Sequence, residues 1–146
     1  MSSALAPVRQ TRLYLDTSAY LCILLAEDGW KDLARETEGA DLLSSVLLVL
    51  EAKRNLVRLA REGTLTESQF RECLERVDLD AELFALHELT LELCQSNSMP
   101  VVTTPRSLDL AHLRTALSFH QSEPLDRFVT VDDAQRQSAR EMGLPV

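Results

Sequence analysis

Short apolar runs alternate along this chain with stretches in which apolar residues recur at helical spacing. The run Leu13–Leu15 is apolar enough to be buried on both faces and predicts a strand. A helix is predicted over 17–27, where apolar residues recur at helical spacing and Thr17 or Ser18 can accept a backbone N–H as the cap. The chain therefore begins with a strand that leads directly into a helix.

The same order returns twice. A predicted strand, Leu42–Ser45, runs into a helix that ends at Gly63, with one of the strand's two serines as the cap. Thr66 and Gln69 have the spacing of a capping box at the start of the next helix. Near the C-terminus, the sequence RFVTV predicts a strand, and DDAQRQSAREMG predicts a helix closed by Gly143.

The middle of the chain is less regular. Residues 82–95 follow a mostly helical pattern, although LFAL is also compatible with the start of a strand, so both interpretations stay open. The sequence SNSMPVVTTP predicts a loop, and RSLDLAHLRTALSF predicts another helix. Alternating strands and helices favour an α/β fold with a parallel sheet covered by helices on both faces. We expect one domain over 1–146, with residues 1–11 as a flexible N-terminal extension.

Composition restricts the classes of protein. The longest apolar stretches, YLCILLA and VLLVL, fall short of the roughly 20 residues of a membrane-spanning helix. The first residues lack the pattern of a secretory signal, and the three cysteines form no C-x-x-C pair. We expect a cytoplasmic protein without a membrane partner. The net charge of −8 argues against a nucleic-acid coat protein with a broad basic face, but it is compatible with a nuclease that gathers acids around cations.

Several common catalytic motifs are absent from the sequence. With four glycines, the chain contains neither G-x-G-x-x-G nor a phosphate-binding loop, which makes a nucleotide-cradling site unexpected. No G-x-S-x-G nucleophile elbow is present either. The candidate chemistry therefore lies in the acidic residues.

Four acids interrupt apolar surroundings. Asp16 and Asp132 each follow a predicted strand, and parallel strands place their carboxyl ends at one edge of a sheet. Glu51 follows VLLVL, and Asp109 lies in the first turn of its helix. Taken singly, each has a simple structural role: a helix cap for the two strand-end aspartates, a partner of a nearby arginine for Glu51, and a dipole complement for Asp109. Taken together, carboxylates facing one apolar-walled edge repel each other unless cations such as Mg²⁺ or Mn²⁺ neutralise them.

The chain resembles a known family in the order of its motifs. LYLDTSAYL, SSVLLVLEAKRNL, RSLDLAHLRTAL and FVTVDDAQRQSAREMGLPV look like the successive motifs of PIN-domain ribonucleases, especially VapC-type toxins. The resemblance implies a three-layer α/β/α fold. It also implies that Asp16, Glu51, Asp109 and Asp132 are the catalytic and metal-binding acids. Asp133, the neighbour of Asp132, is the alternative fourth acid.

The resemblance implies an Mg²⁺- or Mn²⁺-dependent endoribonuclease, the toxin of a type II toxin–antitoxin pair. Asp16 and Asp109 would be the primary ligands, Asp132 would hold a second ion directly or through water, and Glu51 would position or deprotonate the attacking water. The implied partners are an RNA substrate, a cognate antitoxin that covers the acidic groove, and a second copy of the chain in a homodimer.

Other side chains are secondary candidates. Ser18 and Thr130 match small hydroxyl positions of the family, and Thr17 is placed to help hold Asp16 as well as to cap the helix. Asn55 lies one turn beyond Glu51 and is either a hydrogen-bond partner or solvated. His112 shares a helix face with Asp109, where a packed or hydrogen-bonded histidine is the more common case than a ligand.

A basic run follows Glu51. Lys53, Arg54 and Arg58 are predicted either to guide the RNA backbone or to form a solvated helix face. Three rival functions stay open: a housekeeping RNA-processing nuclease, a degenerate interaction module, and a phosphatase-like α/β domain. The last is disfavoured because the first strand ends in DTS rather than D-x-D.

Overall fold

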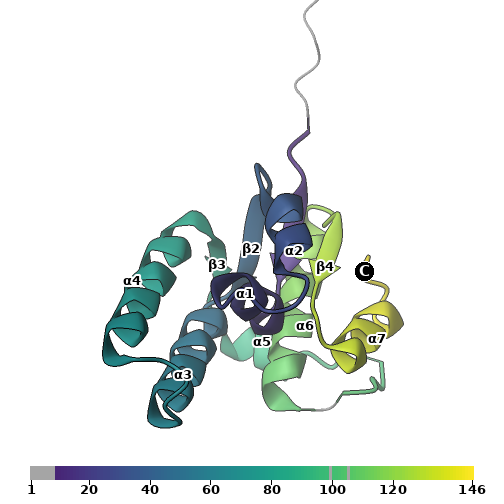
Figure 1. The fold of residues 1–146 in the computed structure, drawn as a ribbon. Coiled ribbons are helices and arrows are strands. Elements are labelled where there is room, and N and C mark those ends of the chain that lie inside the picture. Colours follow the sequence, from purple (N-terminus) through teal and green to yellow (C-terminus); the bar gives the residue numbers. More distant parts are fainter. Residues whose placement is uncertain (1–8, 99, 105) are drawn as a thin grey trace, which may run out of the picture.

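The computed structural model describes residues 9–98, 100–104 and 106–146. Within these residues, four strands and seven helices follow one another along the chain (Figure 1). In chain order they are β1 (Arg12–Leu15), α1 (Thr17–Leu24), α2 (Trp30–Thr37), β2 (Asp41–Ser45), α3 (Leu47–Arg61), α4 (Glu67–Leu83), β3 (Ala85–His87), α5 (Leu91–Gln95), α6 (Ser107–Ser122), β4 (Arg127–Val129) and α7 (Asp133–Glu141).

The strands form one sheet in the order β3-β2-β1-β4, and every neighbouring pair is parallel. The predicted α/β fold with a parallel sheet is therefore confirmed. The first strand lies inside the sheet, because Tyr14 pairs with Leu43 of β2 on one side and with Phe128 of β4 on the other. All four strands point the same way, so the loops that follow them share one edge of the sheet.

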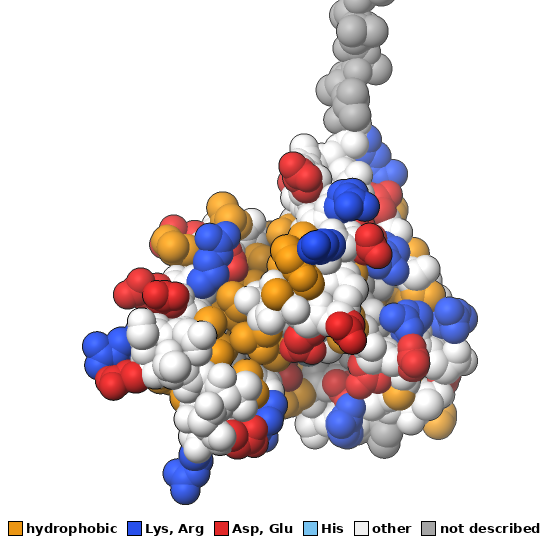
Figure 2. All heavy atoms as spheres, viewed as in Figure 1, with side chains coloured by type: hydrophobic (Ala, Val, Ile, Leu, Met, Phe, Trp, Pro, Cys, Tyr) orange, Lys and Arg blue, Asp and Glu red, His pale blue; other side chains and the backbone are white. Residues whose placement is uncertain are grey.

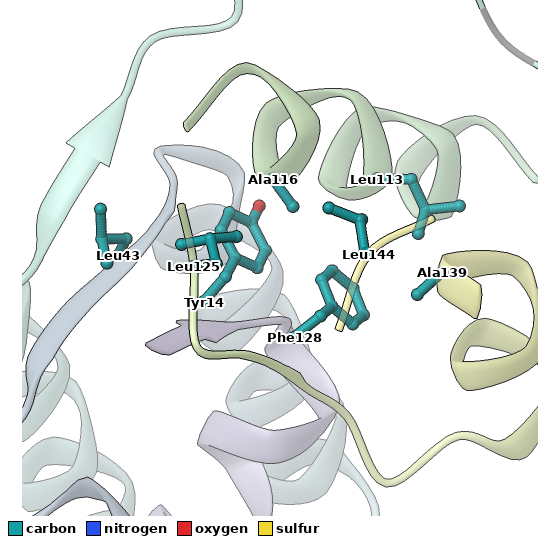
Figure 3. Packing of buried hydrophobic residues seen from close by; sticks show 8 residues of the cluster. All are labelled: Tyr14, Leu43, Leu113, Ala116, Leu125, Phe128, Ala139 and Leu144. Carbon is teal, nitrogen blue, oxygen red and sulfur yellow. The ribbon is translucent and has the colours of Figure 1, made fainter. Parts of the chain in front are cut away.

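Both faces of the sheet are buried. Tyr14, Leu43 and Phe128 pack on one face against Leu113 of α6 and Ala139 of α7, as Figure 3 shows. The Tyr14 and Phe128 rings are stacked, with centroids 5.3 Å apart.

The opposite face is covered by the first two helices. Leu13, Leu15 and Val129 are buried there against Ala19 of α1 and Leu33 of α2. Alternate residues of one strand thus point into two separate cores. The result is three layers: helices, sheet and helices.

The helices α3 and α4 form a hairpin beside the sheet (Figure 1). Its core includes Leu56 of α3 and Val77 of α4, packed with Tyr20 of α1. The predicted capping box is confirmed, since Thr66 accepts from the backbone N–H of Gln69 while the Gln69 side chain accepts from the backbone N–H of Thr66. Hydrophobic side chains gather between this hairpin and α1 and α2 (Figure 2), where a groove of about 410 Å³ lies.

Some predicted element boundaries are wrong. The helix predicted over 17–27 ends at Leu24, and its cap is Asp16 rather than Thr17 or Ser18, because an Asp16 carboxylate oxygen accepts the backbone N–H of Ala19. The following helix α2 was not predicted.

Other predicted caps and elements also differ from the structure. The prediction that Ser44 or Ser45 caps α3 is wrong, because the N-cap is Val46 and no side chain caps the helix. Ser45 does accept the backbone N–H of Leu47, and Ser44 donates to the carbonyl of Leu15. Of the two interpretations left open for 82–95, the strand is confirmed: the three-residue strand β3 lies between the end of α4 and the short helix α5. The strand predicted over 127–131 ends at Val129.

The predicted loop 96–105 contains neither helix nor strand in its described residues, and positions 99 and 105 lie outside them. Residues 1–8 of the predicted N-terminal extension also lie outside the described part. Residues 9–11 contact the domain, since Gln10 donates to the carbonyl of Gly39 and Arg9 to that of Pro124. No helix in the described residues has the length and apolar character needed to cross a membrane.

Candidate functional site

A pocket of about 430 Å³ lies at the edge where the strands end, and all four candidate acids line it. Asp16 directly follows β1, and Asp132 lies three residues after β4. Glu51 comes from the second turn of α3, and Asp109 from the first turn of α6. The chain thus brings together carboxylates that are far apart in the sequence.

Asp16 is the most buried of the four, with 5% of its surface exposed. One carboxylate oxygen accepts from the hydroxyl of Ser18 at 2.7 Å and from the N–H of Ala19 at 3.0 Å, and the other accepts from the hydroxyl of Thr130 at 2.6 Å. Burial raises the pKa of this carboxyl, and the hydrogen bonds from Thr130, Ser18 and Ala19 oppose the rise. The carboxylate is fixed in one orientation but poorly solvated.

Ser18 and Thr130, both predicted to lie beside the acids, form a small hydroxyl network. Their oxygens are 3.1 Å apart, and each also accepts a backbone N–H from the segment that leads to α7, Ser18 from Val131 and Thr130 from Asp132. The loop after β4 is thereby attached to the start of α1. This attachment sets the position of Asp132 relative to Asp16.

Glu51 has a different environment. One of its carboxylate oxygens, Oε1, accepts from Thr17 Oγ1 at 2.9 Å and lies 2.7 Å from Nε2 of His112. The other imidazole nitrogen of His112 lies 2.7 Å from the hydroxyl of Tyr14. Thr17 was predicted to help hold Asp16. Its hydroxyl instead donates to Glu51. The arginines one turn along the helix that could have paired with Glu51, Arg54 and Arg58, are not among its hydrogen-bond partners in the described residues.

Asp109 and Asp132 share one cation. Arg106, which immediately precedes α6, has Nε 2.8 Å from Asp109 Oδ2 and Nη2 3.5 Å from Asp132 Oδ2. Asp132 also caps α7, because its Oδ1 accepts the backbone N–H of Gln135. Gln135 in turn donates to the backbone carbonyl of Asp109. The beginnings of α6 and α7 are thus held together at the pocket.

The donor set is suited to a hard divalent cation, since the four acids offer carboxylate oxygens and the neighbours offer hydroxyls. The guanidinium of Arg106 shows that a positive charge is accommodated between Asp109 and Asp132. In the described residues, however, no three carboxylate, imidazole or thiol groups come close enough together to hold a metal ion. A bound ion would therefore require the carboxylates to move closer together and Arg106 to move away from Asp109 and Asp132.

The remaining predicted residues lie at or outside the rim. Asn55 lines the pocket, but its side-chain amide donates to the backbone carbonyl of Glu51 and not to the carboxylate. The Asp133 side chain is 97% exposed and pairs with Arg136, outside the pocket lining. Of the two adjacent acids, Asp132 is the one that lines the pocket.

The basic run on α3 does not line the pocket either. Lys53 pairs with Asp78 at 2.6 Å, and Arg58 pairs with Glu62 at 3.2 Å. Arg54 is exposed. On the face drawn in Figure 2, acidic and basic side chains are interspersed. Among the described residues, the positively charged side chain that lines the pocket is that of Arg106, which lies outside the basic run.

Two features of the pocket were not predicted. One is Arg106 with its two carboxylate partners, and the other is the contact of His112 with Glu51. A signal for each exists in the sequence, because Arg106, Asp109 and His112 are spaced three apart and fall near one face of a helix. The partner of His112 across the fold has no local signal. Tyr14 precedes it by 98 residues.

Comparison of the chain with models of known protein families gave no match, and comparison with curated proteins gave no similar sequence.

Proposed function

We propose that this protein is a divalent-metal-dependent endoribonuclease of the cytoplasm that hydrolyses RNA phosphodiester bonds. The observation that carries the proposal is the pocket lined by Asp16, Glu51, Asp109 and Asp132, at the sheet edge where α/β proteins bind ligands. The resemblance of the sequence motifs to PIN-domain ribonucleases supports the same interpretation. It also supports a toxin of the VapC type, with an antitoxin and a second copy of the chain as partners.

Each acid has a role in the proposal. Asp16 and Asp109 would be the primary ligands of Mg²⁺ or Mn²⁺, and Asp132 would hold a second ion directly or through water. When bound, the metal supplies charge stabilisation at the phosphate and lowers the pKa of water. Glu51 takes the proton from the attacking water. Ser18 and Thr130 keep the Asp16 carboxylate oriented toward the pocket while it is short of solvent.

Arg106 has to change partners in this proposal. Its guanidinium neutralises Asp109 and Asp132, and because its side chain is 68% exposed, it can swing outward when a cation takes its place. Released, it is a cation at the pocket entrance that suits a phosphate of the RNA backbone. Lys53, Arg54 and Arg58 would then extend the path of the RNA along α3.

The test compares acids inside the pocket with one outside. Purified protein is incubated with total RNA in Mg²⁺ or in chelator, and fragment ends are mapped for wild type, Asp16→Asn, Asp109→Asn, Asp132→Asn and Asp133→Asn. We expect Mg²⁺-dependent cleavage by wild type. The Asp16 and Asp109 variants should lose it entirely.

The adjacent pair Asp132 and Asp133 supplies the matched control. Asp133→Asn changes one exposed carboxylate next to the pocket and should cleave like wild type, whereas Asp132→Asn should be strongly impaired. Undiminished cleavage by folded Asp16→Asn and Asp109→Asn would refute the proposal. Inhibition by the product of a neighbouring gene that encodes a small DNA-binding protein would separate a toxin from a housekeeping nuclease.

A second candidate function is a degenerate interaction module without catalysis. The bridge from Arg106 to Asp109 and Asp132 favours it, because a permanently paired pocket needs no metal. Titration of Mn²⁺ into the protein distinguishes the two. Saturable binding that is lost in Asp16→Asn supports the nuclease, and no binding supports the module.

A further inference from the structure

His112 is a buried histidine whose partners are all side chains. Only 2% of its surface is exposed, although it contributes to the pocket lining. The other two histidines bond the backbone: His120 accepts the N–H of Leu125, and His87 lies 2.6 Å from the carbonyl of Glu88. A histidine that served packing alone would need no partner among the pocket acids. His112 has one.

The imidazole is held from the core side by Tyr14. That residue is fully buried in β1, its ring is stacked on Phe128, and its hydroxyl points toward α6 (Figure 3). The hydroxyl lies 2.7 Å from Nδ1 of His112. When Tyr14 donates to Nδ1, that nitrogen is an acceptor, and the ring proton is on Nε2.

The imidazole faces Glu51 on the pocket side. Nε2 lies 2.7 Å from Oε1 of Glu51 and 3.1 Å from the hydroxyl of Thr17, which itself donates to the same carboxylate oxygen. Oε1 is thus held by two groups. For Oε2, no hydrogen bond is formed within the described residues. One oxygen of Glu51 is fixed, and the other is available to the pocket.

We propose that His112 is the positioning residue for Glu51: Tyr14 fixes the imidazole with its proton on Nε2, and Nε2–H holds Oε1 so that Oε2 stays directed at the pocket. This inference rests on the proposed function, in which Glu51 accepts the proton of the attacking water. A glutamate has three rotatable side-chain bonds, and an acceptor that swings away from the water loses the geometry that proton transfer requires. His112 restricts that freedom without touching RNA or metal.

The kinetic test uses three variants and a matched control. His112→Leu removes the donor, Tyr14→Phe removes the group that fixes the imidazole, and His112→Gln keeps a side-chain N–H. We expect kcat to fall about 10- to 100-fold in His112→Leu, with KM and Mn²⁺ affinity within about 2-fold of wild type. The kcat of His112→Gln should lie between those of His112→Leu and wild type. Tyr14→Phe should lower kcat by less than His112→Leu does. His120→Gln, the same substitution farther along α6, should cleave like wild type.

A double variant tests the route of the effect. If His112 acts through Glu51, then Glu51→Gln/His112→Leu should be no slower than Glu51→Gln alone. Losses that multiply would overturn the inference. Thermal unfolding followed by circular dichroism shows whether each variant is folded. If His112→Leu does not fold, the kcat values of His112→Gln and Tyr14→Phe test the inference in its place.

A spectroscopic measurement stands apart from catalysis. In protein labelled with ¹⁵N-histidine, the two ring nitrogens report which one carries the proton. We expect the Nε2–H form for His112 in wild type, with an altered Nδ1 resonance in Tyr14→Phe. A proton on Nδ1 would overturn the inference even if RNA is cleaved. An Nε2–H imidazole in a protein that cleaves no RNA would instead refute the proposed function and leave the hydrogen-bond assignment standing.

Discussion

Asp16 is both a helix cap and a pocket acid. Its Oδ1 accepts the backbone N–H of Ala19 in the first turn of α1, and its Oδ2 accepts from the hydroxyl of Thr130, far along the chain. The structural role and the chemical role are therefore compatible in one side chain. The energetic cost is that a carboxylate with three hydrogen bonds remains almost without water, and burial raises its pKa.

The raised pKa of Asp16 predicts how stability depends on pH. A carboxyl whose pKa is higher in the folded than in the unfolded protein contributes stability that is fully present below about pH 4, its unfolded range, and that is lost as the pH rises through the raised value. Asp16→Asn cannot ionise and escapes this loss. The difference in the midpoint of thermal unfolding, Asp16→Asn minus wild type, should therefore become more positive as the pH rises from 4 to 7.

Divalent cations provide the second arm of that experiment. Mn²⁺ binds the ionised carboxylate, so it should raise the unfolding midpoint of wild type at pH 7 and leave that of Asp16→Asn nearly unchanged. Asp133→Asn, which changes an exposed carboxyl, should follow wild type throughout. A constant difference between Asp16→Asn and wild type at every pH would contradict the assignment of the burial cost to Asp16.

At the scale of elements, α6 organises the pocket. Arg106 precedes its first turn, Asp109 follows three residues later and His112 three residues after that, so one helix face carries a cation, an acid and an imidazole. This order makes the start of α6 self-neutralising. A metal ion has to compete with Arg106 for Asp109 and Asp132.

The competition predicts the effect of removing Arg106. In Arg106→Gln, Mn²⁺ should bind several-fold more tightly than in wild type, because no guanidinium has to be displaced from the two carboxylates. Isothermal titration calorimetry measures the affinity. Arg71→Gln, which removes a cation from an exposed pair with Glu67 on α4, is the matched control and should bind as wild type does. Weaker binding in Arg106→Gln would show that the arginine does not compete.

Elements with a local signal were predictable, and elements that depend on tertiary pairing were not. The capping box of Thr66 and Gln69 spans four consecutive residues and was predicted correctly. In contrast, β3 has three residues and exists because it pairs with β2, with Ala85 beside Leu43. Its sequence fits the end of a helix equally well. The edge strand is decided by its neighbour rather than by its own apolar pattern.

The same division holds for the site. That the four acids share one pocket could be predicted, because Asp16 and Asp132 follow predicted strands, Asp109 lies in a first helical turn and Glu51 follows the apolar run VLLVL. Their partners could not, since His112 meets Tyr14 and Glu51 only after three separate elements have packed together. Arg106 has a local signal, its spacing of three residues from Asp109.

For the whole molecule, the core on the α6 side of the sheet also supports the pocket. Phe128 is 1% exposed and stacked on Tyr14, whereas Leu83 on α4 is 72% exposed. Phe128→Ala should lower the free energy of unfolding by about 3–5 kcal/mol, and Leu83→Ala should change it by less than about 0.5 kcal/mol. Urea-induced unfolding measures both.

The two alanine variants should also differ at the pocket. Phe128→Ala loosens the ring of Tyr14, so the ¹⁵N spectrum of His112 should change in the folded variant, and that of Leu83→Ala should not. Equal destabilisation by the two substitutions would contradict the packing seen in Figure 3.

The hydrogen bond between Asp16 and Thr130 joins residues 114 positions apart. A ribosome that has translated only as far as α5 therefore carries a nascent chain that already has Asp16 and Glu51 but lacks Asp109, His112, Thr130 and Asp132. Such a chain has no pocket. Were the protein to cut RNA, the nascent chain would gain that activity only after α6 and the segment that follows β4 have been synthesised and have packed against β1.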